Sequence, residues 1–163
     1  GALGETSVLG GKAEANPVTA AAPSATAAPA PAGASLAMNE QTDFDAAKSK
    51  FNSGDYAAAA QAFADFTAAY PGGPLSSEAM YMRGEALKQT GDVTGAARAW
   101  LDAFNADKTG PRAPDSLLML GKALGDIGQN AEACATLGQV SARFPGTGAA
   151  DQAASSRAGL GCQ

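Results

Sequence analysis

The sequence predicts an all-α fold: a solenoid of three helix–turn–helix units followed by a C-terminal capping helix. Three observations support this prediction. Glycine, small and bulky positions recur at one fixed period after residue 42. Val and Ile together number five in 163 residues, which disfavours sustained β-strands. The chain has 41 Ala, so its large apolar residues suffice only for a thin core of closely packed helices.

The repeat is visible in three matched columns of residues. Gly54, Gly91 and Gly128 are each separated by 37 residues, and a large apolar residue follows nine positions after each glycine. The large residues are Phe63, Trp100 and Leu137, and the small residues five positions after each glycine are Ala59, Ala96 and Ala133. Self-similarity at such a period is the signature of a repeat array, in which each unit packs against the next.

The N-terminal part has a different composition. In residues 16–34, thirteen of nineteen residues are Ala or Pro and none is charged. Prolines interrupt a helix, and small side chains offer little surface to bury. Residues 1–41 are therefore expected to be a disordered Ala/Pro-rich linker, with the repeat domain at residues 42–163.

Each repeat is expected to contain two helices around a glycine turn. The units should span about residues 43–73, 77–110 and 114–146, with prolines breaking the chain between them. Within the second unit, Gly91 can end one helix and Asp92 can cap the next. After Pro145, residues 147–160 are expected to form a helix that covers the otherwise bare end of the array.

Composition excludes several kinds of function. The chain has no His, which removes His-dependent catalysis and mixed Cys/His zinc sites. A net charge of -5 disfavours nucleic-acid binding, and no apolar run reaches the roughly 20 residues of a membrane-spanning helix. Acid pairs such as Asp43 and Asp45 are more typical of a solvated helix face than of acid–base catalysis. No enzymatic activity and no cofactor are expected.

Three segments carry a resemblance to known families. They read AKSKFNSGDYAAAAQAFADFTAAYPGGPLSSEAMYMRGEALKQTGD, PDSLLMLGKAL and AEACATLGQVSARFPGT. The pattern resembles the tetratricopeptide repeat. More closely, residues 43–163 are similar to the periplasmic Tol–Pal-associated cell division coordinator family (YbgF or CpoB). The second unit departs from that pattern, with Val93 for the usual Tyr and Asp107–Lys108 where Tyr–Pro would stand.

This resemblance implies a periplasmic protein–protein interaction adaptor. It would couple peptidoglycan synthesis to outer-membrane constriction in cell division, through TolA and a bifunctional penicillin-binding protein. Residues 1–42 show no heptad pattern, so the family's coiled-coil trimer is not expected and the chain should be monomeric. The alternative function is a tetratricopeptide scaffold of outer-membrane protein assembly.

The partner-binding site is expected on the concave surface that the first helices of such units line. Helical phase places outward-facing residues of all three units on that surface, and seven of them are taken as the candidate site, with a largely exposed ring expected for the central tyrosine. The seven are Phe44, Lys48, Asn52, Tyr81, Glu85, Gln89 and Lys122. The alternative is that these residues form ordinary solvated helix faces.

The two cysteines are the last candidates. Cys134 lies in the third unit and Cys162 follows the capping helix, so the helical order returns Cys162 to the third unit. In an oxidising compartment the pair is expected to form a structural disulfide that holds the cap. In a reducing compartment both would be free thiols.

Overall fold

The computed structural model describes residues 32–163, in which the secondary structure consists of seven α-helices and no strand. The all-α prediction is confirmed for this part of the chain. The disorder expected for residues 1–31 falls outside the described residues. The helices are α1 (Ala32–Asn52), α2 (Tyr56–Ala69), α3 (Ser76–Gln89), α4 (Val93–Ala106), α5 (Ala113–Asp126), α6 (Asn130–Arg143) and α7 (Gly148–Leu160).

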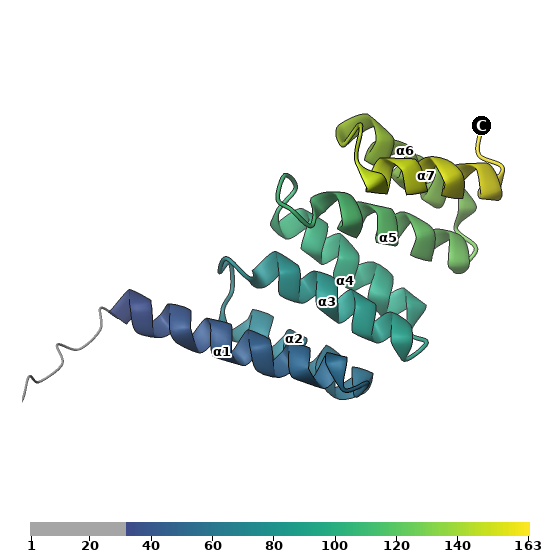
Figure 1. Cartoon of the computed structure of the whole chain (residues 1–163). Coiled ribbons are helices and arrows are strands. Elements are labelled where there is room, and N and C mark those ends of the chain that lie inside the picture. Colours follow the sequence, from purple (N-terminus) through teal and green to yellow (C-terminus); the bar gives the residue numbers. More distant parts are fainter. Residues whose placement is uncertain (1–31) are drawn as a thin grey trace, which may run out of the picture. The chain divides into compact units, whose positions relative to one another are not determined.

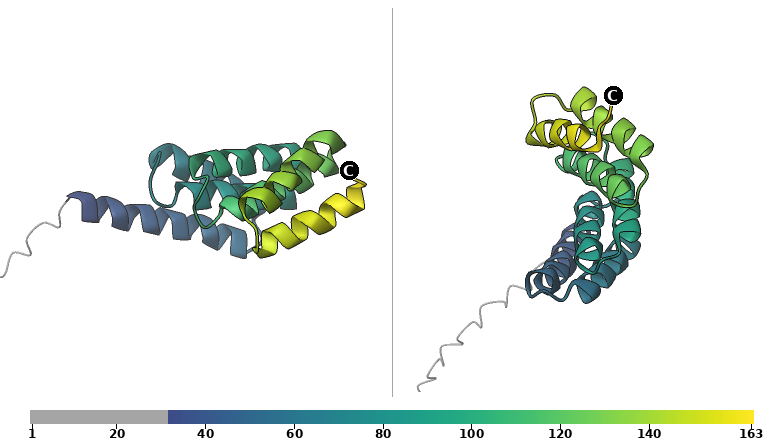
Figure 2. Two further views of the ribbon diagram at one scale, coloured as in Figure 1. Left: turned by 90° about the horizontal axis from the view of Figure 1, so that it is seen from above. Right: turned by 90° about the vertical axis from the view of Figure 1, so that its right-hand side faces the viewer.

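The helices of this solenoid form two layers. Helices α1, α3, α5 and α7 lie in one layer, and α2, α4 and α6 lie behind them (Figure 1). Each helix packs against the next one in the chain, and α7 also packs against α5. Viewed along the helices, the layers of residues 32–163 follow an arc, with the first layer on its inner side (Figure 2). The first helix of each unit and the cap therefore line the concave face.

The glycine turns join the two helices of each unit. Gly54, Gly91 and Gly128 have φ angles of 83°, 86° and 83°, in the left-handed region that glycine adopts without strain. In the first two turns an aspartate follows the glycine and caps the next helix. The carboxylate of Asp55 accepts a hydrogen bond from the Ala58 N–H at 3.3 Å, and that of Asp92 accepts one from the Gly95 N–H at 2.8 Å. The Gly–Asp pair therefore ends one helix and starts the next.

Small residues on the first helices allow the large repeat residues to be buried. Phe63, Trp100 and Leu137 have exposed fractions of 0%, 1% and 0%. Trp100 lies against Gly84, where an added Cβ atom would come within 2.6 Å of the Trp100 Cδ1 atom. Gly121 is placed in the same way against Leu137. The alternation of small and large residues thus brings the two helices of a unit into close contact.

The first helix begins ten residues before the domain boundary expected at residue 42. Glu40 on this extension is only 8% exposed, and its carboxylate accepts a hydrogen bond from the Leu75 N–H at 3.3 Å. Nearby, the Tyr70 hydroxyl donates to Asp43 Oδ2 at 2.6 Å. The Ala-rich composition had indicated a linker in this segment. However, no proline occurs between residues 32 and 70, and alanine has the highest helix propensity, so the same composition favours a helix.

Within residues 32–163, no helix is both long enough and apolar enough to cross a membrane.

Candidate functional site

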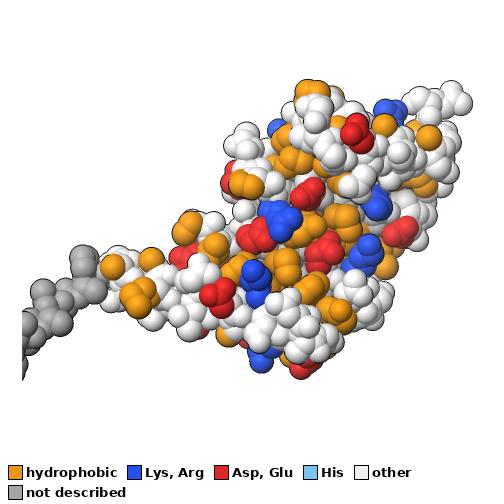
Figure 3. Space-filling view, viewed as in Figure 1, with side chains coloured by type: hydrophobic (Ala, Val, Ile, Leu, Met, Phe, Trp, Pro, Cys, Tyr) orange, Lys and Arg blue, Asp and Glu red, His pale blue; other side chains and the backbone are white. Residues whose placement is uncertain are grey.

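The concave face combines an apolar floor with charged groups of both signs. Figure 3 shows this face, with Lys, Arg, Asp and Glu side chains distributed around apolar atoms at its centre. The seven residues selected from the sequence lie on α1, α3 and α5, the helices that line it. Lys48, Asn52 and Gln89 are exposed, whereas Tyr81, Glu85 and Lys122 are partly buried.

Phe44 is not available as a groove residue, and its assignment from the sequence is wrong. Its side chain is 4% exposed and makes edge-on contacts with Phe63 and Phe66, at centroid distances of 5.8 and 5.6 Å. Phe44 lies three residues before the buried Ala47, on the same inward stripe of α1. The ammonium group of Lys48 covers the ring at 5.7 Å from its centroid. Lys48, not Phe44, is thus the exposed residue at this point.

Arg112 connects the two central helices of the concave face. It lies immediately before α5, with its guanidinium carbon 4.4 Å from the centroid of the Tyr81 ring on α3. Its Nε and Nη2 atoms donate to the two carboxylate oxygens of Glu78 at 2.6 and 3.0 Å. Its Nη1 atom donates to Asp115 at 3.3 Å. The hydrogen bond to Glu78 raises the pKa of Arg112, whereas partial burial acts in the opposite direction.

Tyr81 is half-buried, and the expectation of a largely exposed ring is wrong. The ring packs against the core cluster that contains Trp100 and Leu117. Burial raises the pKa of Tyr81, and the negative charge of Glu85 raises it further. The phenol therefore stays protonated over the physiological range and can donate a hydrogen bond.

Glu85 has an incompletely satisfied carboxylate. Its Oε1 atom is shielded from solvent and accepts no hydrogen bond from any group in residues 32–163. Glu85 lies one helical turn after Tyr81, on the same side of α3. The nearby Arg112 directs its hydrogen bonds to Glu78 and Asp115 instead. The Oε1 atom is therefore left unpaired beside the central aromatic ring, whereas a hydrogen bond from the ring hydroxyl to Glu85 contributes to the raised pKa of Tyr81.

The cap contributes to the concave face, which the sequence did not indicate. A hollow of about 320 Å³ lies between α5 and α7, and Lys122 lines its α5 side. The α7 side is polar and contains Asp151, Gln152, Ser155 and Ser156. Helix α7 therefore extends the candidate surface beyond the third unit.

Arg112 is the other contributor that sequence reasoning missed. It stands between Pro111 and Pro114, in a segment interpreted only as a break between units. The one sequence feature that could have drawn attention to Arg112 is Asp115, an acidic residue three positions later that forms a salt bridge with it. The stronger pair with Glu78 joins residues that are 34 positions apart, so no local pattern reveals it.

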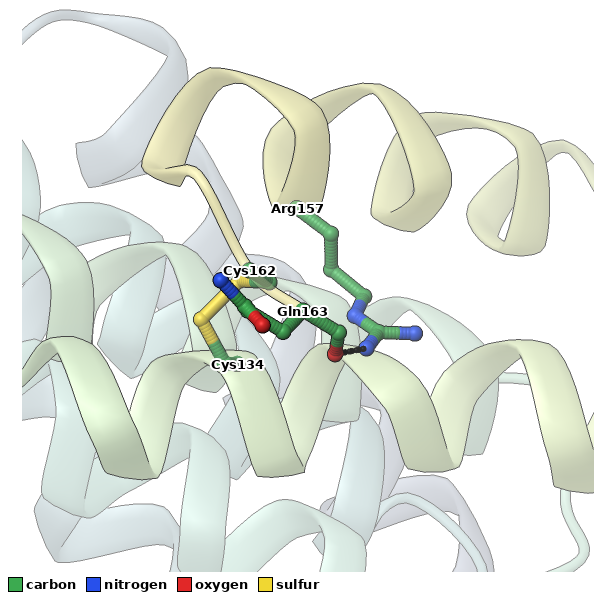
Figure 4. The surroundings of a disulfide bond; sticks show 4 residues. All are labelled: Cys134, Arg157, Cys162 and Gln163. Carbon is green, nitrogen blue, oxygen red and sulfur yellow. Dashed lines mark hydrogen bonds between the residues drawn. A yellow bond between two sulfur atoms is a disulfide. The ribbon is translucent and has the colours of Figure 1, made fainter.

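The two cysteines are joined by a disulfide at the C-terminal end (Figure 4). Cys134 lies on α6 and Cys162 follows α7, with a Cα–Cα distance of 5.6 Å. Arg157 on α7 donates from Nη2 to the carbonyl oxygen of Gln163 at 3.1 Å. The disulfide fastens the end of α7 to α6 of the last repeat, and the Arg157 contact holds the C-terminal residue against α7.

The described residues contain no cluster of three or more His, Cys, Asp or Glu side chains arranged to hold a metal ion. Across residues 32–163, the functional groups of the concave face are instead suited to contacts with another polypeptide. They comprise a half-buried aromatic ring, amides and charges of both signs.

Comparisons with known proteins agree with this architecture. Two family models, both described as tetratricopeptide repeat, match residues 44–113 and 115–147, and together they cover more than half of the chain. A comparison with curated protein sequences finds no match.

Two solved structures are similar in fold. One is the second tetratricopeptide domain of the human RPAP3 protein in complex with an HSP70 peptide. It has a TM-score of 0.65 and 18% identity, with 77% of this chain and 98% of that chain covered. The other is the type III secretion chaperone SycD of Yersinia enterocolitica in complex with a peptide of the translocator YopD. Its TM-score is 0.61 at 15% identity, with 74% of this chain and 87% of that chain covered.

Tetratricopeptide domains are non-catalytic scaffolds that mediate protein–protein interaction, and they use the concave surface of a solenoid for binding. The family models, the seven-helix architecture and the related structures lead to the same assignment. The chain belongs to the tetratricopeptide repeat family.

Proposed function

We propose that this protein is a periplasmic adaptor of the Tol–Pal system that coordinates peptidoglycan synthesis with outer-membrane constriction during cell division. Its partners would be the periplasmic part of TolA and a bifunctional penicillin-binding protein. The proposal rests on the resemblance of residues 43–163 to the cell division coordinator family. The disulfide between Cys134 and Cys162 is compatible with an oxidising compartment such as the periplasm.

The observation that carries the binding role is the composition of the concave face. Tyr81 presents a half-buried ring at its centre, held by Arg112 and flanked by Glu85. Lys48, Asn52, Gln89 and Lys122 complete the proposed surface on the neighbouring helices. Aromatic anchors surrounded by polar groups are typical of sites where a few residues supply most of the binding energy.

The peptide complexes of the two related structures also support this role. RPAP3 binds an HSP70 peptide and SycD binds a peptide of YopD. By analogy, the surface of this chain would accept a single segment of a partner, either extended or helical.

Calorimetric titration of the purified chain against each partner domain would test the proposal. We expect a modest affinity for at least one partner, which is weakened when Tyr81 is replaced by Ala. Absence of binding to both the TolA domain and the penicillin-binding protein would contradict the Tol–Pal assignment. Binding to an outer-membrane assembly protein instead would favour the alternative scaffold function.

A further inference from the structure

Three charged residues occupy the same position in successive repeats. Lys48, Glu85 and Lys122 are separated by 37 residues each, the repeat period, and lie on α1, α3 and α5. Equivalent positions of stacked units lie side by side, so these three side chains form a row across the concave face. We call them the charge row, which reads positive, negative, positive.

The charge row is not neutralised from within the domain. Among residues 32–163, the only salt bridges are those of Arg112 with Glu78 and Asp115. Lys48 is exposed, and the partly buried Lys122 lines the hollow between α5 and α7. None of the three charges forms a salt bridge with another described residue, although Asp151 lines the same hollow as Lys122.

Glu85 is the strongest of the three positions for recognition. Its Oε1 atom is shielded from water and lacks a hydrogen-bond donor among the described residues. Because part of the carboxylate is withdrawn from water, its charge is less screened, and a basic group that reaches the accessible part of Glu85 is attracted more strongly. Arg112 directs its hydrogen bonds to Glu78 and Asp115. Within the described part of the chain, no salt bridge joins Glu85 to Arg83 or Lys88 on its own helix.

We propose that the concave face recognises a partner segment in which one basic residue stands between two acidic residues. The basic side chain pairs with Glu85 beside the Tyr81 ring, and the acidic side chains pair with Lys48 and Lys122. The occupant is therefore a segment of alternating charge, and the charge complementarity of the row selects it. This inference rests on the proposed use of the concave face for protein binding.

The repeat geometry specifies the spacing of these charges. Directly packed helices lie about 8–10 Å apart, and α1, α3 and α5 are not directly packed on one another, so about 10 Å is the smallest separation expected between their side chains. A partner segment in the polyproline II conformation advances about 3.1 Å per residue with three residues per turn, so charged residues three positions apart lie on one side of it, about 9 Å from each other. The motif is acid, two residues, base, two residues, acid.

Synthetic peptides test the motif without any natural partner. The first peptide carries Glu, Lys and Glu at that spacing in an Ala/Ser background, and the second carries Lys, Glu and Lys. A third carries Glu at all three places. Titrations followed by amide chemical shifts, with peptide up to millimolar concentration, give the affinities. We expect the first peptide to bind about tenfold more tightly than the second, and the perturbed amides to lie on α1, α3 and α5.

Charge reversal at Glu85 provides the decisive comparison. Glu85→Lys should bind the all-Glu peptide in preference to the first peptide, which reverses the order seen for the natural sequence. Glu85→Gln keeps the shape of the side chain and should reduce the discrimination. Asp102→Lys is the matched control, since Asp102 is exposed on α4 in the other layer and the charge change is the same. The control should preserve the original order.

Equal affinity for the first and second peptides, or no binding of either, would overturn the charge-row proposal. So would an unchanged order in a folded Glu85→Lys protein, with circular dichroism as the check of folding. These results are independent of the Tol–Pal assignment. If the TolA domain binds equally well to the natural and Glu85→Lys proteins, the charge row is wrong and the adaptor role stands. If the protein distinguishes the first peptide from the second but binds neither partner domain, the charge-row proposal stands and the adaptor role is wrong.

Discussion

The guanidinium group of Arg112 lies over the Tyr81 ring, 4.4 Å from its centroid, while its Nε atom donates to Glu78 at 2.6 Å. Tyr81 and Glu78 are on α3, and Arg112 immediately precedes α5. One side chain thus links the second unit to the third and fixes the orientation of the central ring. Because the ring lies on the concave face, this contact would pre-organise the proposed binding surface before a partner binds.

Arg112→Ala is expected to lower the free energy of unfolding by about 1 kcal/mol, because it removes a paired charge-assisted contact that is partly exposed to solvent. Arg112→Lys should recover only part of this loss, since an ammonium group cannot form the planar two-point contact with Glu78. Urea unfolding measures both values. Arg98→Ala on the exposed side of α4 is the control, and an equal effect at the two positions would show that the Arg112 contacts contribute nothing.

Tyr81→Ala is expected to weaken partner binding by about 1–3 kcal/mol. Since the ring packs on the core, the same change should lower stability by about 2 kcal/mol. Tyr81→Phe keeps the packing and the contact with Arg112, and should leave stability nearly unchanged. Calorimetric titrations at a temperature where all three proteins are folded separate the two effects. Full affinity in a folded Tyr81→Ala protein would place the binding site elsewhere.

Gly84→Ala should destabilise the domain by about 1–3 kcal/mol, because the new methyl group overlaps the buried Trp100 ring and forces α3 and α4 apart. Gly159→Ala makes the same chemical change on α7, where an added Cβ meets nothing within 4 Å. Alanine has the higher helix propensity, so that variant should be neutral or slightly more stable. Thermal unfolding of both variants, together with Trp100 fluorescence, provides the comparison. An unaltered melting temperature in Gly84→Ala would show that the two helices can separate at no cost.

Cys162→Ser should lower the stability of the oxidised protein by about 3 kcal/mol, because the disulfide closes a loop across 28 positions and restricts the unfolded chain. Hydrogen exchange should increase most in α7, which the bond fastens to α6. Reduction of the natural sequence is the control, and it should reproduce the loss. Two readily alkylated thiols in protein isolated from an oxidising compartment would contradict the pairing in solution.

The repeat architecture was predictable because its determinants are local and recur. The Gly–Asp turns specify where one helix ends and the next begins. The repeat positions occupied by Gly84 and Trp100 specify which faces of the two helices of a unit pack together. The placement of Cys162 near the third unit followed from helix order alone. The start of α1 was missed since composition does not distinguish an Ala-rich spacer from an Ala-rich helix, and the Glu40 contact with Leu75 joins residues 35 positions apart.

The sequence by itself determined the number of units, their turns and the helices that form the concave face, because a fixed period places equivalent residues at equivalent positions. Only the tertiary structure decided which side chains on those helices remain available. Phe44 was drawn into the core by Phe63 and Phe66, and Tyr81 was half-covered by Arg112. Helical phase predicts the direction of a side chain only to within a broad sector around the helix. The burial of that side chain depends on how closely the neighbouring helices approach. Contacts between residues that are far apart in the sequence set this distance.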